Sequence, residues 1–229
     1  MELTTDSWVL WQWGIVRINA TMVFTWGVMA LLTAVSWGVT RRLSSGIEIG
    51  RGQVVLEVIV TSIRRQIEEV APGQADRLLP FIGTLFLFIA TSNVLLVVPL
   101  YRPPTGSLST TSALAFAVFV AVPYFGIAHL GVGRYLSQYA QPSVLMLPFN
   151  ILGELSRTLA LSVRLFGNIM SGTLIGAVLL SLAPLFFPVL LQALGLLTGL
   201  IQAYVFAVLT LIYLASATRV RGEKQAKQA

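Results

Sequence analysis

Residues 145–182 read LMLPFNILGELSRTLALSVRLFGNIMSGTLIGAVLLSL, and this mostly apolar stretch decides the fold. If it were helical throughout, it would be about 57 Å long, because an α-helix rises about 1.5 Å per residue. The apolar core of a bilayer is only about 30 Å thick. The stretch must therefore either break or cross a membrane at a steep tilt.

The composition of the whole chain agrees with a membrane protein. Hydrophobic residues make up 56% of the 229 residues and charged residues only 10%, whereas a soluble domain carries about 25% charged residues. The net charge of +6 is read as basic loops facing the cytoplasm, so no nucleic-acid partner is predicted. The chain has no cysteine and one histidine, His129. These counts exclude disulfides, thiolate sites and multi-histidine metal sites, and we predict no metal and no cofactor.

Long apolar runs separated by short polar stretches predict an all-α membrane protein with five transmembrane helices and one interfacial helix, forming a single domain over 1–229. Residues 51–70 are too charged to span and are typical of an amphipathic helix at the membrane surface. Residues 134–144 are expected to form a loop. The predicted spans are 18–39, 78–100, 110–132, 145–182 and 189–218, and Pro184 and Pro188 mark a turn between the last two.

Basic residues near the membrane set the predicted topology. Arg41, Arg42 and the arginines of 51–70 mark an inner loop, and the tail after residue 218 carries four basic residues. The segment before the first span is acidic, with only Arg17 close to the membrane. We therefore expect the N-terminus outside and the C-terminus in the cytoplasm of a cell (inner) membrane.

Arg164 is the residue that most needs an explanation. Apolar residues flank it on both sides, and a central arginine costs at least about 2.5–3.5 kcal/mol on insertion scales. Asn168 lies one turn away, and Arg157 and Ser171 lie two turns away, so one helix face carries all four. Arg164 either serves an ion or substrate path or is a structural arginine, paired with Glu154 or reaching the interface.

Gln202 is the matching polar residue of the last span. Gly195 and Gly199 precede it on the same side of the helix, which suits close helix packing. The alternative is functional, with Gln202 facing Arg164 across a helical hairpin. Two further sets have two interpretations: Asn93 with Ser92 (channel lining or interhelical bonds) and Thr110 with Thr111 (helix cap or channel mouth). Glu154 is expected to pair with Arg157 at i,i+3.

Two segments of the chain resemble the hallmark segments of the F-type ATP synthase a subunit: LPFNILGELSRTLALSVRLFGNIMSGTL (147–174) and LIQAYVFAVLTLIYL (200–214). The specific cores are RLFGN and IQA-x-x-F-A-x-L-T. SNVLLVVP (92–99) and PTGSLSTTSALAF (104–116) occupy the places of two further family motifs. The resemblance covers nearly the whole chain and is weakest before residue 78.

The resemblance implies a function. The last two spans would form a tilted hairpin against a ring of c subunits, and b subunits of a peripheral stalk would be further partners, held in part by 51–70. Arg164 matches the essential stator arginine, Asn168 a polar residue of an access channel and Gln202 the glutamine facing the arginine. Ser171 and Asn93 are added as candidate residues of two offset half-channels. No G-x-x-x-x-G-K-[ST] motif occurs in the chain, so ATP chemistry is assigned to partner subunits and this chain is predicted not to be an enzyme.

The chain departs from the family pattern at two positions. Thr173 stands where many relatives have a glutamate, and Gly195 where many bacterial relatives have a histidine. The coupling ion is therefore predicted to be H⁺ or Na⁺, and hydroxyl, amide and carbonyl oxygens are adequate for Na⁺. Two rival functions also fit these residues: a stand-alone secondary transporter that binds an anion at Arg164, and a purely structural membrane anchor.

Overall fold

The structure is a computed structural model of the chain, and it describes residues 9–13, 16–41, 51–98, 101–139, 145–182 and 187–218. The described part begins with a short antiparallel pair of strands and continues as helices. The elements, in order, are β1 (Val9–Trp13), β2 (Val16–Asn19), α1 (Ala20–Thr40), α2 (Arg51–Val70), α3 (Ala75–Val94), the 3-10 turns η2 (Leu95–Val97) and η3 (Pro104–Gly106), α4 (Leu108–Leu130), α5 (Val132–Tyr139), α6 (Met146–Leu182) and α7 (Phe187–Thr218).

Five of these helices, α1, α3, α4, α6 and α7, are long and apolar enough to cross a membrane, which confirms the predicted fold class. Helix α6 is continuous over 37 residues, so the first of the two alternatives for this stretch, a break, is ruled out. A helix of that length is about 56 Å long and must tilt to fit a slab of about 30 Å.

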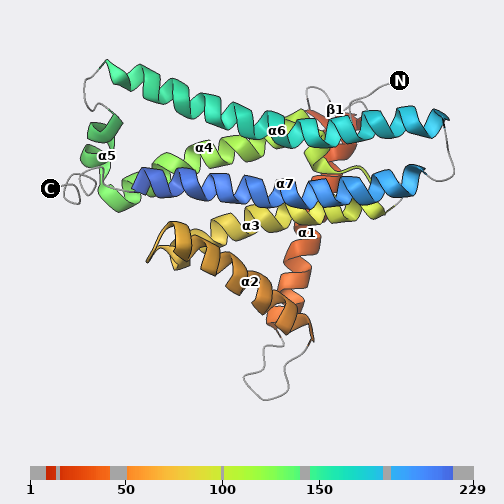
Figure 1. Ribbon diagram of the computed structural model, residues 1–229, viewed down its shortest axis with the longest axis horizontal. Coiled ribbons are helices and arrows are strands. Elements are labelled where there is room, and N and C mark those ends of the chain that lie inside the picture. Colours follow the sequence, from red (N-terminus) through yellow and green to blue (C-terminus); the bar gives the residue numbers. More distant parts are fainter. Residues whose placement is uncertain are drawn as a thin grey trace.

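Helices α3, α4, α6 and α7 run side by side along the long axis of the molecule, whereas α1 and α2 lie at an angle to them (Figure 1). Helices α6 and α7 run in opposite directions and pack against each other, as the predicted hairpin requires (Figure 1). Helix α7 also packs along α3, and α6 along α4. Helix α7 thus lies between α6 and α3, and α4 contacts both helices of the hairpin.

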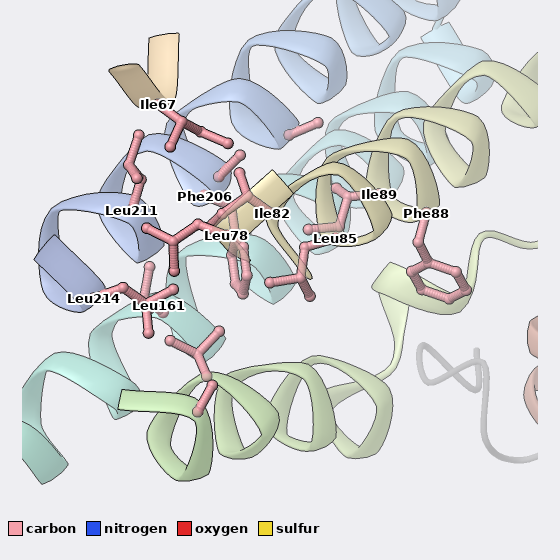
Figure 2. Close-up of a cluster of buried hydrophobic side chains, with 14 of the residues drawn as sticks. Ile67, Leu78, Ile82, Leu85, Phe88, Ile89, Leu161, Phe206, Leu211 and Leu214 are labelled. Carbon is pink, nitrogen blue, oxygen red and sulfur yellow. The ribbon is translucent and has the colours of Figure 1, made fainter. Parts of the chain in front are cut away.

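The apolar core lies where α2, α3, α4, α6 and α7 meet, and Figure 2 shows Phe206 of α7 and Leu78 of α3 within it. Both side chains are fully buried. Outside this core, large apolar side chains are exposed on every long helix. In the apolar stretch of α1 only 6% of the residues are buried. Such a surface suits a helix surrounded by lipid or by partner helices.

Helix α2, the predicted interfacial helix, has the predicted bounds and packs Ile67 and other apolar residues of its second half into the core beside α3. Arg64 Nη2 lies 2.8 Å from Asp76 Oδ1 of α3, and within α2 Arg65 Nε lies 3.3 Å from Glu69 Oε1. At its end Glu68 accepts a hydrogen bond of 2.8 Å from the backbone N–H of Gly73, whose φ of 75° closes the turn before α3. Glycine adopts this left-handed conformation without steric cost.

Three expectations need correction. The loop expected at 134–144 is wrong for its first part, because α5 covers Val132–Tyr139. The strands β1 and β2 were not predicted at all. Pro188 was expected in a turn but lies in the first turn of α7, where a proline costs no hydrogen bond. Pro184, the other proline of that expected turn, lies outside the described residues.

Candidate functional site

Arg164 lies near the middle of α6 and is exposed. It has no hydrogen bond or ion pair with any residue in the described part of the chain. Ser171 is also exposed and Asn168 is half-buried, so the polar stripe predicted from helical spacing faces away from the bundle. Ser171 Oγ donates to the Asn168 carbonyl oxygen at 3.2 Å, and Thr173 Oγ1 donates to the Met170 carbonyl oxygen at 2.9 Å. The stripe therefore offers one free guanidinium beside hydroxyl and amide groups.

The second arginine of the stripe behaves differently. Arg157 Nη1 lies 3.9 Å from Glu154 Oε2, which confirms the expected i,i+3 pair. The Arg157 guanidinium also lies over the ring of Tyr213 in α7, with Cζ 5.6 Å from the ring centroid, close enough for a cation–π contact. Arg157 thus helps to join α6 to α7, and the pairing with Glu154 that the structural alternative assigned to Arg164 is made by Arg157.

The four glycines on α6 leave open space around its surface. A Cβ added at Gly153, Gly167, Gly172 or Gly176 would meet nothing within 4 Å among the residues that the structure describes. Packing inside this chain therefore gives no reason for glycine at these positions. Room for close approach of another helix is what small residues provide in membranes.

Gln202 lies on the opposite, inner side of the hairpin. Its side chain is 9% exposed, and its Nε2 atom has no hydrogen-bond partner among the described residues. Ala203 and Phe206, which neighbour it on α7, are fully buried. A buried amide group without a partner costs on the order of 1–3 kcal/mol, and such groups in native proteins call for an explanation. No contact between Gln202 and Arg164 is present among the described residues, so their facing across the hairpin stays a prediction.

Asn93 connects three elements. It is 1% exposed, and its Nδ2 donates to the carbonyl oxygen of Gly199 in α7 at 2.9 Å. Its Oδ1 accepts from Oγ1 of Thr105 in η3 at 3.5 Å. Of the two interpretations left open for Asn93, the interhelical bond is thus present in the structure. Its neighbour Ser92 donates to the Phe88 carbonyl oxygen within α3 at 2.7 Å.

A second group of hydroxyls joins α4 to α6. Ser162 Oγ lies 3.1 Å from Ser112 Oγ and donates to Thr111 Oγ1 at 3.4 Å, and Thr111 also donates to the Ser107 carbonyl oxygen at 3.2 Å. Ser162 and Thr111 are buried. The sequence reasoning missed Ser162, although a serine two residues before the arginine lies on another face of the same helix and was open to the same helical argument.

Tyr101 lies in the connection between η2 and η3 and was also missed. Its ring makes an edge contact with Phe24 of α1, with 5.2 Å between centroids. Burial raises the pKa of the Tyr101 hydroxyl to about 12, and the nearby Ser92 hydroxyl lowers it slightly. Tyr101 therefore stays neutral at every physiological pH and ties α1 to this end of the bundle.

Comparisons with known proteins agree with the resemblance drawn from the motifs. The family model for the ATP synthase A chain matches residues 22–215. The chain is 60% identical to ATP synthase subunit a 2 of Acaryochloris marina, over 96% of this chain and 94% of that protein. It is 60% identical to ATP synthase subunit a 1 of Chlorobaculum parvum (96% and 98% covered) and 55% identical to ATP synthase subunit a of Albidiferax ferrireducens (98% and 97% covered).

Proposed function

The chain belongs to the ATP synthase A chain family, and from that membership we propose that it is the stator subunit that carries ions past a rotor of c subunits, with Arg164 as its central residue. The observation that carries the proposal is the position of Arg164. It is exposed at mid-helix on an apolar span and has no partner in the described part of the chain. An unpaired intramembrane arginine is costly and is retained where it serves a function.

The physics of ion transfer explains why an arginine is suited to this position. A bare carboxylate is very costly to expose to lipid, so a rotor carboxylate crosses the lipid-facing arc only when it is ion-bound and neutral. A permanent positive charge on the stator favours ion release and stabilises the bare carboxylate. Arginine remains protonated even when it is buried. The same charge blocks a direct leak between the two half-channels.

The surface around Arg164 fits a rotor helix. Val163 and Leu159 are exposed beside it, and the open glycines of α6 leave room for a partner backbone. Asn168, Ser171 and Thr173 continue the polar side of this surface toward the end of α6. We assign them to the ion path, together with Gln202 and Gly195 of α7. The exposed valines in the first half of α2 offer an apolar surface to the bilayer or to a b subunit: Val54, Val55, Val58 and Val60.

The decisive experiment is ATP-driven ion pumping by the assembled complex in vesicles. Arg164→Ala is expected to abolish pumping while the complex still assembles, because Arg164 has no partner within the described chain to lose. Arg157→Ala is the matched control, since it removes an arginine from the same stripe that is already paired; it is expected to retain pumping. Undiminished pumping by Arg164→Ala would overturn the proposal, and loss of assembly with Arg164→Ala alone would favour the structural anchor.

The stand-alone transporter remains the alternative from another class. A cavity of about 250 Å³ lies between α2, α3 and α7, but its lining is mostly apolar, includes Tyr204 and Phe86 and does not include Arg164. An anion site would require the arginine to line such a space. The transporter predicts substrate uptake by the purified subunit alone, and the stator predicts none.

The coupling ion is H⁺ or Na⁺, and two positions favour Na⁺. Thr173 and Gly195 replace ionisable residues that many relatives carry, and proton relays in membranes usually use ionisable side chains. The polar groups assigned to the path here are hydroxyls and amides. ATP-driven transport measured with Na⁺ replaced by K⁺ tests this point, and activity indifferent to Na⁺ would exclude Na⁺ as the coupling ion.

A further inference from the structure

A buried hydrogen bond of 2.9 Å from Asn93 Nδ2 to the Gly199 carbonyl oxygen joins α3 to α7. The acceptor is a backbone carbonyl, which can only accept, so the amide must present its NH₂ end. The opposite end of the amide, Oδ1, faces the Thr105 hydroxyl, which can donate. The two contacts therefore agree on one orientation of the Asn93 side chain. This orientation leaves Asn93 little capacity to bind an ion.

Glycine is the only residue type that fits at position 199 in this contact. A Cβ added at Gly199 would lie 2.8 Å from Asn93 Cγ and 2.9 Å from Asn93 Cβ, distances that real Cβ atoms do not adopt. At Gly195, one turn earlier on the same side, an added Cβ would meet only Leu96 Cδ2 at 3.9 Å, an ordinary contact. The requirement for glycine is thus local to the Asn93 contact.

A second hydrogen bond, two turns earlier on α7, joins α7 to η2, the turn that directly follows α3. Gln192 Nε2 donates to the Leu96 carbonyl oxygen in η2 at 3.1 Å. The two bonds are reciprocal, because one side chain comes from each partner. Together they hold α7 at two points about 10.5 Å apart along its axis, seven residues at about 1.5 Å each. Two such points fix both the axial position and the rotation of α7.

Gln202 follows Gly199 by three residues, so the two lie on the same face of α7, separated by about 4.5 Å along the axis. Gln202 is nine-tenths buried and its Nε2 is unpaired in the described structure. A displacement of α7 would move this amide directly. On the proposed stator function, we infer that Asn93 is a positioning residue: its bond to Gly199 sets the rotation and register of α7 that present the Gln202 amide to the ion path.

The absence of cysteine from the chain allows register to be measured by disulfide cross-linking in the assembled complex. Cross-linking between Leu96→Cys in η2 and Gly195→Cys in α7 measures the position of α7 next to the Asn93 bond. Ser112→Cys with Ser162→Cys is the control pair, because it joins α4 to α6 and the native oxygens lie 3.1 Å apart. Each pair is examined with Asn93, with Asn93→Ser and with Asn93→Leu. Serine is the milder change, too short to span to Gly199.

We expect Asn93→Ser to lower cross-linking at 96/195 and to leave 112/162 unchanged. In the complex without added cysteines, the maximal rate of ATP-driven pumping should fall about 10-fold or more, since a misplacement of about 1 Å can cost up to about 100-fold. The ion concentration that gives half the maximal rate should not change, because Asn93 does not bind the ion.

Each other outcome overturns the inference. Unchanged cross-linking at 96/195 would show that Asn93 does not set the register, and loss at both pairs would show general loosening. A raised half-saturating ion concentration with intact cross-linking would make Asn93 an ion ligand. Normal pumping despite a changed register would separate α7 position from Gln202. The stator function itself is judged independently by Arg164→Ala, so normal pumping by the Asn93 variants beside an inactive Arg164→Ala would refute only the positioning role.

Discussion

The contrast between Gly199 and Gly195 gives a stability prediction whose size follows from the structure. Both glycines lie on one face of α7, and Gly→Ala in a helix interior gains about 0.8–1.0 kcal/mol in intrinsic propensity. This gain is common to both sites and cancels when they are compared. At Gly199 the methyl group would overlap Asn93, and overpacking costs about 1–3 kcal/mol. Loss of the hydrogen bond adds about 0.6 kcal/mol, the average for interhelical bonds in membranes.

Gly199→Ala is therefore expected to be less stable than Gly195→Ala by about 2–4 kcal/mol. Gly195→Ala should equal or slightly exceed the natural chain, because its Cβ meets only Leu96 Cδ2 at 3.9 Å. The free energy of unfolding is measured for the purified chain in mixed micelles with increasing dodecyl sulfate. The linear dependence of this free energy on denaturant is compared across variants at one reference composition.

A double-mutant cycle completes the test. Asn93→Gly removes both the Cβ and the Cγ atoms that would overlap the methyl group, so Asn93→Gly in the Gly199→Ala chain should cost less than Asn93→Gly alone. Additive losses would mean that the two residues do not interact, and equal stability of Gly199→Ala and Gly195→Ala would refute the steric argument outright.

Two further predictions follow from single contacts, and a third follows from the predicted topology. Gly126→Ala should destabilise the chain by about 1–3 kcal/mol, because the Tyr135 ring occupies the space of the new Cβ, and Tyr135→Leu should rescue it in the same unfolding assay. Tyr101, with its pKa raised from 10.0 to about 12, binds its proton more tightly when folded, so its contribution to stability is complete below pH 10 and is lost as the pH rises through 12; Tyr101→Phe should lose less stability over that range, measured by unfolding at several pH values. A cysteine introduced as Lys224→Cys should react with a membrane-impermeant maleimide only from the cytoplasmic side, and labelling from outside would reverse the predicted topology.

The long helices could be predicted because each apolar run exceeds the length that a bilayer requires. Helix α5 could not, because its eight residues, VGRYLSQY, are half polar and too short for a periodic signal. Its fold depends on tertiary contact, with Tyr135 buried against Gly126 of α4. The strands β1 and β2 lack the Asn-Gly or Asp-Gly turn that marks a hairpin in sequence.

The residues of the candidate site were predictable in identity but not in orientation. Arg164 is conspicuous because a charge in an apolar run is costly, and helical spacing then names Asn168 and Ser171 as its neighbours on the face. Spacing gives angles within one helix and leaves the rotation of that helix against its neighbours open. In a soluble protein the contrast between water and core settles the rotation, but lipid is as apolar as the core of this bundle.

The rotation of α7 must then be set by directional contacts, and the structure contains them. Asn93 of α3 binds the Gly199 carbonyl oxygen of α7, and Gln192 of α7 binds the Leu96 carbonyl oxygen of η2. At Gly199 even a Cβ atom would overlap the Asn93 side chain. Apolar side chains can slide past one another at little cost, whereas a hydrogen bond broken in hydrocarbon leaves a polar group without water to replace it. On the positioning role inferred for Asn93, the chemistry available at Gln202 depends on a glycine one turn earlier, which carries no functional group of its own.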